Sequence, residues 1–197
     1  MRMNKIKSRL IVFLIFMLTF VTGYSASNEI KVGMECGYAP FNWFQDTNKN
    51  GAVPTNGGYC GGYDVEIAKV IAKKLGKKLV IVKTEWDALL GPALTSGKVD
   101  LVIAGMSATP ERKQSLLFTK PYYESDLVVV VKKNGKYAKA KSINDFSGAR
   151  ITGQLNTLHY DVIDQMKGVS KQTAMESFPA MIVALNSNKI DGYVSER

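Results

Sequence analysis

One stretch of the chain combines features that suit the binding of a small anion. Residues 104–112 have the sequence AGMSATPER. Gly105 lets the backbone approach a ligand closely, while Thr109 and Pro110 are typical of the cap and first residue of a helix. Free N–H groups at a helix start attract anions, and the guanidinium of Arg112 can bind a carboxylate through two parallel hydrogen bonds. The stretch predicts a carboxylate site; the alternative is a capped helix with Arg112 in a surface ion pair.

Two more polar positions occur later in the chain. Residues 153–157 (GQLNT) form a second strand-to-helix turn, where Thr157 could give a backbone N–H and a hydroxyl to the same carboxylate. Glu196 ends a later strand, and a carboxylate there can pair with an α-ammonium group. Simple helix capping is the alternative for Thr157, and an exposed acid is the alternative for Glu196.

An acid and aromatic residues suit the side chain of such a ligand. Glu35 ends the first strand and is followed closely by Tyr38 and Phe41. This combination suits a cationic or amide group, because a cation–π contact contributes about 0.5–2 kcal/mol. Trp86 opens a helix and could form the opposing wall, with packing in the core as the alternative.

The composition argues against other kinds of site. The sequence has one histidine, His159, and its two cysteines form no C-x-x-C motif, so we expect no metal site. It has no recognisable Ser/His/Asp set, and we predict neither catalytic residues nor a cofactor. The formal net charge of +9 includes four cations within the first nine residues. The other lysines are scattered, which indicates a solvated basic surface rather than a nucleic-acid groove.

Residues 1–26 are predicted to be a signal peptide. Four basic side chains precede an apolar run over residues 10–21, which is of signal-peptide length, and we place cleavage between Gly23 and Ser27. Residues 21–23 are similar to the start of a bacterial lipobox, but Tyr24 stands where the lipidated cysteine would be. We expect an exported protein, periplasmic or extracellular, without a lipid anchor. An uncleaved membrane anchor is the alternative.

Strands and helices alternate along the rest of the chain, as their apolar periods and caps indicate. The segment 35–63 is rich in Gly, Asn and Pro and is expected to be loop or hairpin. This order predicts an α/β fold with a mostly parallel sheet covered on both faces. The predicted strands are residues 30–34, 79–82, 99–104, 126–133, 150–152, 169–173 and 190–194, and the predicted helices are residues 64–75, 86–95, 142–146, 157–166 and 177–186.

An internal repeat supports a division into two lobes. Residues 93–102 (ALTSGKVDLV) resemble residues 184–193 (ALNSNKIDGY), each with a helix end, a Ser-x-Lys turn and a strand that opens with an apolar residue and Asp. We predict lobe 1 over residues 28–125 and lobe 2 over residues 126–197, with a hinge near residues 124–129. Ligands of open α/β sheets bind beyond the carboxyl ends of the strands, which places the predicted site between the lobes.

The two cysteines allow two interpretations. Export permits a disulfide between Cys36 and Cys60, which would close a loop of moderate size. Two free thiols are the alternative, because spacing alone does not give the geometry.

Four motifs, in this order, resemble those of the polar amino-acid binding proteins of ABC importers. They are residues 33–41 (GMECGYAPF), 62–68 (GYDVEIA), 107–112 (SATPER) and 118–123 (FTKPYY). These relatives are extracellular solute-binding proteins of family 3 with the two-lobe type II periplasmic-binding-protein fold. The resemblance runs from about residue 28 to the end of the chain. It implies a monomer that captures a free amino acid and docks on the permease subunits of an ABC transporter.

The resemblance also implies which residues bind the backbone groups of the ligand. The α-carboxylate would be bound by Arg112, Ser107 and Thr157, and the α-ammonium by Glu196 and the backbone carbonyl of Gly105.

For the ligand side chain, the resemblance implies a place between Tyr38 and Trp86, with its polar end on Glu35. An acid between aromatic residues favours a basic amino acid, arginine or lysine. Glutamine and histidine remain alternatives, because a carboxylate also accepts hydrogen bonds from an amide or a ring N–H.

The chain departs from the family pattern at two places. The family often has Gly-Ser/Thr-Thr at the second-lobe turn, where residues 155–157 are Leu-Asn-Thr, so the lobe-2 contacts are an open point. Family members also continue past the last residue of this chain, so we expect the fold to be incomplete at the C-terminus. Two other functions are alternatives to a binding protein for transport. The first is a periplasmic lyase or dehydratase, because some proteins of this fold have such activities. The second is the ectodomain of a sensor.

We expect the 197-residue chain, made alone, to be unstable and to bind ligand weakly, because the segment that completes both lobes would be absent. Thermal melting and calorimetry check this expectation. Cooperative unfolding together with micromolar affinity would contradict it.

Overall fold

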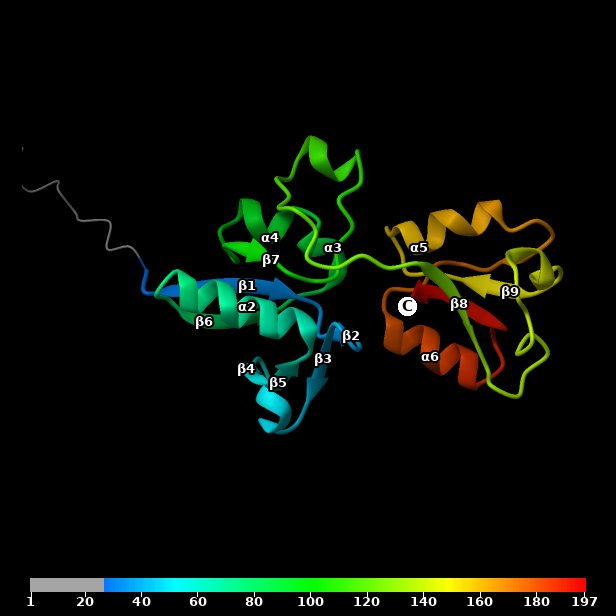
Figure 1. Cartoon of the computed structure of the whole chain (residues 1–197), viewed down its shortest axis with the longest axis horizontal. Coiled ribbons are helices and arrows are strands. Elements are labelled where there is room, and N and C mark those ends of the chain that lie inside the picture. Colours follow the sequence, from blue (N-terminus) through cyan, green and yellow to red (C-terminus); the bar gives the residue numbers. More distant parts are fainter. Residues whose placement is uncertain (1–26) are drawn as a thin grey trace, which may run out of the picture.

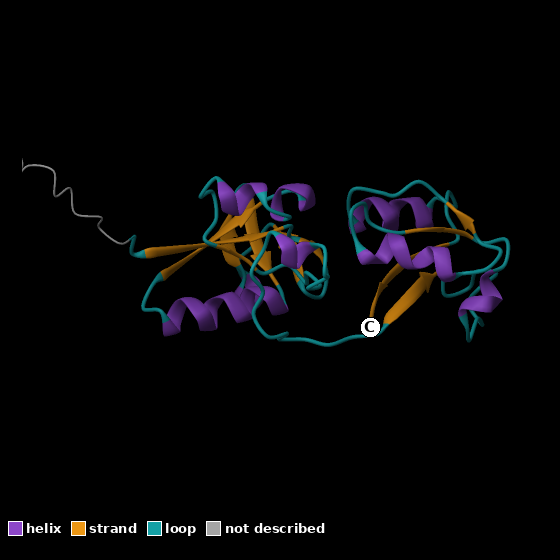
Figure 2. Ribbon diagram, turned by 90° about the horizontal axis from the view of Figure 1, so that it is seen from above, coloured by secondary structure: helices purple, strands orange, loops and turns teal. Residues whose placement is uncertain are grey.

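The computed structural model describes residues 27–197 as two lobes joined by an extended segment (Figures 1 and 2). The predicted signal peptide, residues 1–26, lies outside the described residues. Within residues 27–197, no helix is long and apolar enough to cross a membrane.

The first lobe is built on a parallel three-stranded sheet. Its central strand is β1 (Glu29–Met34), which lies between β6 (Lys78–Lys83) and β7 (Leu101–Val102). Helix α2 (Tyr63–Lys74) packs against β6, and the core contains the buried side chains Val32, Met34, Val65, Ile81, Leu89 and Ile103. The carboxyl end of β1 therefore leads directly to Glu35.

A second, antiparallel sheet occupies part of the segment expected to be loop or hairpin. Its order is β2-β3-β5-β4, with bounds Gly37–Tyr38 (β2), Asn42–Gln45 (β3), Gly58–Gly61 (β5) and Val53–Thr55 (β4); the 3-10 helix η2 (Lys49–Gly51) lies between β3 and β4. A two-residue Asn56-Gly57 turn joins β4 to β5, and Gly57 has a left-handed φ of 84°, which glycine adopts without steric cost. This small sheet positions Tyr38.

The predicted helix over residues 86–95 is two short helices. They are α3 (Trp86–Leu89) and α4 (Pro92–Thr95). Gly91, with φ 160° and ψ −51°, breaks the helical path, and Pro92 starts the new helix because its ring cannot continue the previous one. Trp86 thus begins a separate one-turn element.

The second lobe carries a four-stranded mixed sheet in the order β10-β9-β11-β8. Strands β9, β10 and β11 are parallel, whereas β8 runs antiparallel to β11. The strands are β8 (Leu127–Val131), β9 (Arg150–Thr152), β10 (Ser170–Lys171) and β11 (Gly192–Glu196), and the helices are η4 (Ile143–Phe146), α5 (Leu158–Asp161), η5 (Val162–Gln165) and α6 (Phe178–Asn186). The helix predicted over residues 157–166 is therefore one turn of α-helix followed by 3-10 helix.

The internal repeat has the same geometry in both lobes. The turns after α4 and α6 contain left-handed residues at equivalent places, Gly97 (φ 70°) and Asn188 (φ 58°). The Asp that follows exchanges two hydrogen bonds with a residue of the central strand. Asp100 pairs with Lys31 at 2.8 Å in both bonds, and Asp191 pairs with Arg150 at 2.8 and 2.9 Å. The repeat thus marks one turn unit that occurs in both lobes.

A disulfide joins Cys36 to Cys60, and both residues are buried. It connects the end of β1 to β5 of the small sheet. Glu35 and Tyr38 lie on either side of Cys36, so the disulfide fixes the segment that carries both.

In the full-length protein, we predict that the double variant C36A/C60A loses about 3 kcal/mol of unfolding free energy, because the bond closes a loop with a sequence separation of 24. For a domain of this size the loss lowers Tm by about 6–12 °C. Alanine avoids the cost of burying a serine hydroxyl. Dithiothreitol should lower Tm of the wild type by a similar amount and leave the variant unchanged. An unchanged Tm after verified reduction would contradict the prediction.

Candidate functional site

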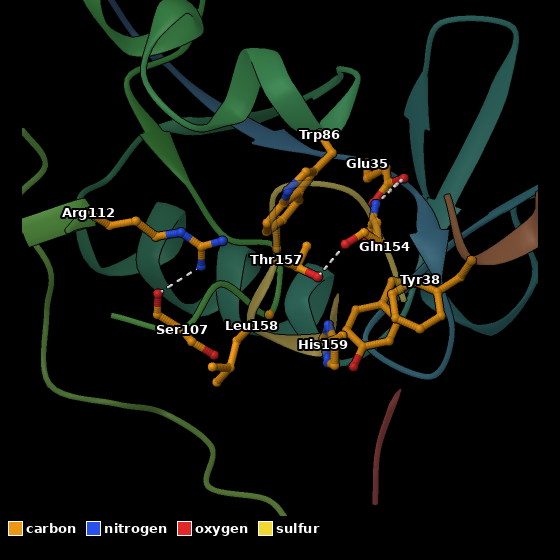
Figure 3. Close-up of a pocket in the computed structure, with 12 residues that line it drawn as sticks. Glu35, Tyr38, Trp86, Ser107, Arg112, Gln154, Thr157, Leu158 and His159 are labelled. Carbon is orange, nitrogen blue, oxygen red and sulfur yellow. Dashed lines mark hydrogen bonds between the residues drawn. The ribbon is translucent and has the colours of Figure 1, made fainter. Parts of the chain in front are cut away.

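A pocket between the two lobes brings together most of the predicted site residues (Figure 3). Lobe 1 contributes Glu35, Tyr38, Trp86, Ala104, Gly105, Ser107 and Arg112, and lobe 2 contributes Gln154, Thr157, Leu158, His159 and Phe178. Seven of the eight predicted residues line it. The eighth, Glu196, lies behind His159 and is not part of the lining.

Arg112 is positioned differently from the sequence prediction. The expected α-helix is wrong, because only the 3-10 helix η3 (Arg112–Gln114) forms there. The predicted cap is present, since Oγ1 of Thr109 accepts a hydrogen bond from the backbone N–H of Arg112 at 3.4 Å. A single 3-10 turn presents no row of free N–H groups, so the anion site would depend on the Arg112 side chain. Its Nη1 donates to the carbonyl of Ser107 (2.9 Å), and its Nη2 donates to the carbonyl of Asn156 in lobe 2 (3.0 Å).

The same guanidinium lies over the ring of Trp86, with 5.3 Å between Cζ and the ring centroid. Burial lowers the pKa of Arg112, yet arginine remains charged at any physiological pH. Two of the five N–H donors are used within the protein, which leaves donors for a ligand carboxylate. The hydrogen bonds to two backbone carbonyls and the contact with the indole ring fix the orientation of the Arg112 guanidinium group.

The second-lobe turn contacts the first lobe at Asn156. This residue has a left-handed φ of 56°, which asparagine tolerates better than most residues. Its carbonyl accepts hydrogen bonds from both Arg112 and Trp86 Nε1, the latter at 3.3 Å. Its side-chain amide donates to Asp87 at 2.9 Å. Three contacts of one residue therefore hold the lobes together beside the pocket.

Thr157 lies at the predicted place but its hydroxyl is already used. The Oγ1 atom donates to the carbonyl of Gln154 at 2.7 Å and does not cap α5. The buried hydroxyl therefore stabilises the turn that carries Gln154.

Glu35 is a buried carboxylate with a partner from the other lobe. Its residue is 7% exposed, and Nε2 of Gln154 donates to both carboxylate oxygens at 3.1 Å. Burial raises the pKa of Glu35, and the Gln154 hydrogen bond opposes this rise. Gln154 lies in the predicted strand-to-helix turn at residues 153–157, but its sequence context predicts no role for it. No local pattern marks its side chain as the partner of Glu35.

The aromatic residues form a cluster that spans the lobes. Tyr38 stacks on Phe178 of α6 with centroids 4.1 Å apart, and it is tilted against Phe41 at 5.0 Å. Phe178 was not predicted as a site residue, although its place after the helix cap Ser177 follows from the sequence. The ring of Tyr38 is thereby fixed in the floor of the pocket.

Gly105 fits closely against Tyr38. Its φ is +59°, and a Cβ atom there would lie 3.1 Å from Cε1 of Tyr38. Its N–H donates to the hydroxyl of Tyr122, which donates in turn to Oδ1 of the buried Asp64 at 2.6 Å. Asn42 donates to Oδ2 of the same carboxylate at 2.7 Å. Asp64 lies in the first turn of α2 and thereby anchors the Gly105 loop.

Glu196 ends β11 beside His159. Its Oε1 lies 3.5 Å from Nε2 of His159, and the two side chains are 10% and 9% exposed. Burial acts to raise the pKa of Glu196, but the hydrogen bond and charge of His159, with Ser125 and Tyr38, hold it below the ordinary value. Within residues 27–197 there is no cluster of His, Cys, Asp and Glu that could hold a metal ion.

Comparison with known sequences identifies related binding proteins. The family of bacterial extracellular solute-binding proteins, family 3, matches residues 30–167. A relative named "Probable histidine-binding protein" from Campylobacter jejuni is 37% identical over 191 residues, which covers 94% of this chain and 69% of the relative. "ABC transporter arginine-binding protein 1" from Escherichia coli is 30% identical over 174 residues, covering 88% of this chain and 65% of the relative. The chain therefore spans about two thirds of the length of these relatives.

Solved structures show the same architecture. The arginine-bound form of a truncated ArgBP from T. maritima superposes with a TM-score of 0.71 at 28% identity, over 86% of this chain and 74% of that chain. AncCDT-1, an ancestral amino acid-binding protein described as a precursor of cyclohexadienyl dehydratase, superposes with a TM-score of 0.73 at 30% identity, over 86% and 70% of the two chains.

The matching family, the shared two-lobe α/β fold and the pocket between the lobes agree with one another. The chain belongs to the bacterial extracellular solute-binding proteins of family 3.

Proposed function

We propose that this protein is the substrate-binding component of an amino-acid ABC importer and captures a free polar, basic L-amino acid between its lobes. The observation that carries the proposal is the fixed guanidinium of Arg112 at a pocket lined by both lobes. Because this planar group is held by two carbonyls and an indole ring, its remaining N–H donors are preorganised to bind a carboxylate. Relatives named for histidine and arginine binding support an amino acid as the ligand.

Glu35 supports a cationic side chain at the other end of the ligand. Its carboxylate is buried, and an amide is its only partner among the described residues. Desolvation of an ionised carboxylate is costly unless a charge or several donors compensate it. A guanidinium or ammonium group on the ligand would supply that compensation, with Tyr38 and Trp86 as the aromatic walls.

The arrangement of the lobes supports a cycle of closure and docking. Lobe 1 (28–125) and lobe 2 (126–197) close on the ligand by motion near residues 124–129, and the closed form docks on the permease outside the cytoplasmic membrane. The segment that leads into β8 has no helix or strand and crosses between the lobes, which supports a hinge there (Figure 2). In this proposal the protein acts as an exported monomer that binds its ligand without catalysing a reaction.

Calorimetry of the full-length protein against the twenty amino acids tests the proposal. Binding of L-arginine or L-lysine with 1:1 stoichiometry is expected. The absence of heat with every amino acid would overturn it. Turnover of a prephenate-like substrate would favour the lyase or dehydratase alternative.

We predict that R112M weakens binding of every amino acid at least about 30-fold, because breaking a buried, hydrogen-bonded charge pair costs about 2 kcal/mol or more. R112K should also bind weakly, because lysine keeps the charge but lacks the planar fork. R150K is the matched control, since Arg150 pairs with Asp191 outside the pocket and should leave affinity unchanged. Wild-type affinity in R112M would exclude a carboxylate contact.

We predict that E35Q lowers affinity for L-arginine about 10- to 150-fold, as expected for loss of a charge-assisted hydrogen bond of about 1.5–3 kcal/mol. Affinity for L-glutamine should change less than about threefold. Because ligand cations favour ionised Glu35, wild-type affinity for L-arginine should fall as pH drops through the raised pKa of Glu35. E85Q, an exposed neighbour, is the control for general charge effects. Equal losses for both ligands would refute charge pairing.

A further inference from the structure

The end of lobe 2 that faces away from the pocket is strongly basic. The parallel strands β9, β10 and β11 begin at this end and β8 finishes there, whereas β9 and β11 end on the side of the pocket (Figure 1). The loop after β8 and the turns before the three parallel strands therefore bring their cations to one surface. We call this surface the basic pole, and its cations are Lys132, Lys133, Lys136, Lys139, Lys141, Arg150, Lys167 and Lys189.

Hydrogen bonds hold the separate segments of the basic pole together. Nζ of Lys132 donates to the carbonyl of Asn186 at 2.9 Å and to Oδ1 of Asn188 at 2.7 Å, which joins the loop after β8 to the turn before β11. The N–H of Gly148 donates to the carbonyl of Gly168 at 2.7 Å, which joins the turn before β9 to the turn before β10. Lysines that are scattered along the sequence are therefore gathered by the fold.

The positive charge of the basic pole is not balanced locally. Its two carboxylates are already engaged, because Asp191 pairs with Arg150 at 2.8 Å and Asp145 accepts from the backbone N–H groups of Lys141 and Ser142. Eight cations and two carboxylates give the pole a formal charge of +6, whereas the remaining residues of lobe 2 carry two cations and five carboxylates. Lobe 2 is therefore polarised, and the pole attracts an extended negative surface.

The side chains at the basic pole suit the headgroup layer of a membrane. Lys133, Lys139 and Lys141 are exposed, and their ammonium groups make no hydrogen bond or ion pair with any of residues 27–197. Ile143, two residues after the last of them, is 48% exposed. Ammonium groups bind phosphates as point charges, and an exposed apolar side chain among them gains by entering the boundary between headgroups and acyl chains.

We propose that the basic pole binds the surface of a bilayer containing anionic phospholipids, with its lysines at the headgroup phosphates. A nucleic acid fits this surface less well. The ring of Tyr137 is buried and offers no face for stacking a base, and the guanidinium of Arg150 is engaged by Asp191 through two hydrogen bonds. Because the pole lies at the far end of lobe 2, membrane contact there leaves the pocket accessible, whichever ligand it takes.

Co-flotation of the full-length protein with lipid vesicles tests the proposal. Vesicles of phosphatidylcholine with about 30% phosphatidylglycerol should bind the protein in about 0.1 M salt, and vesicles of phosphatidylcholine alone should not. Salt at about 1 M should release the protein, because the Debye length falls to about 3 Å. Millimolar glycerol 3-phosphate should not compete, because the affinity arises from several lysines that act on one surface.

The triple variant K133Q/K139Q/K141Q should lower the partition coefficient on the anionic vesicles about 100-fold, since each lysine near such a surface contributes roughly fivefold. Its Tm should equal that of the wild type, because the three side chains make no contact that stabilises the fold.

The variant K73Q/K74Q/K98Q is the matched control. It removes the same charge from exposed lysines of lobe 1 and should change the partition coefficient less than about threefold. Equal losses in the two triple variants would overturn the proposal, as would equal binding to both kinds of vesicle or to neither. Binding of duplex DNA without binding of anionic vesicles would assign the pole to a nucleic acid instead. These outcomes leave the proposed function intact, because amino-acid binding is measured separately.

Discussion

The carboxylate of Glu35 is held where water is nearly excluded and the two lobes meet. An ion in such a place must be compensated, and the donor that compensates it, Gln154, comes from the opposite lobe. The disulfide at Cys36 and the small sheet that carries Tyr38 fix the segment around this carboxylate. The cost of desolvating this carboxylate favours close contact between the lobes at this point. The same cost is the reason why we infer a ligand with a positively charged side chain.

The sequence predicts the architecture well where hydrophobic periods are long. Helix α2, helix α6 and strand β1 lie within two residues of their predicted bounds, because each has a continuous apolar face and recognisable ends. Predictions were wrong where a single backbone feature decides the outcome. Gly91 divides one predicted helix into two, and the segment after Pro110 forms only a 3-10 turn. Turn chemistry at Asn56-Gly57 also indicates a hairpin that composition alone did not resolve.

Site residues were predictable in proportion to their local signals. Arg112, Glu35 and Thr157 follow strand ends or caps, and the fold brings them to one pocket. Gln154, Phe178 and His159 are marked only by partners that are distant in the sequence. Gln154 contacts Glu35, whereas Phe178 and His159 both contact Tyr38. Such long-range contacts produce no periodic pattern in the sequence, so only the three-dimensional structure reveals them. Glu196 illustrates the converse, since the sequence places it correctly at a strand end while the structure sets His159 in front of it.

Asn156 makes its three contacts to lobe 1 through one peptide carbonyl and one side-chain amide. Because these atoms belong to one residue, the lobes cannot separate there gradually; the contacts to Arg112, Trp86 and Asp87 must be lost within the same small displacement. These contacts resist the first separation of the two lobes. They have little influence on how a ligand approaches a cleft that is already open. The residence time of the ligand, more than its rate of capture, is therefore the quantity that this turn controls.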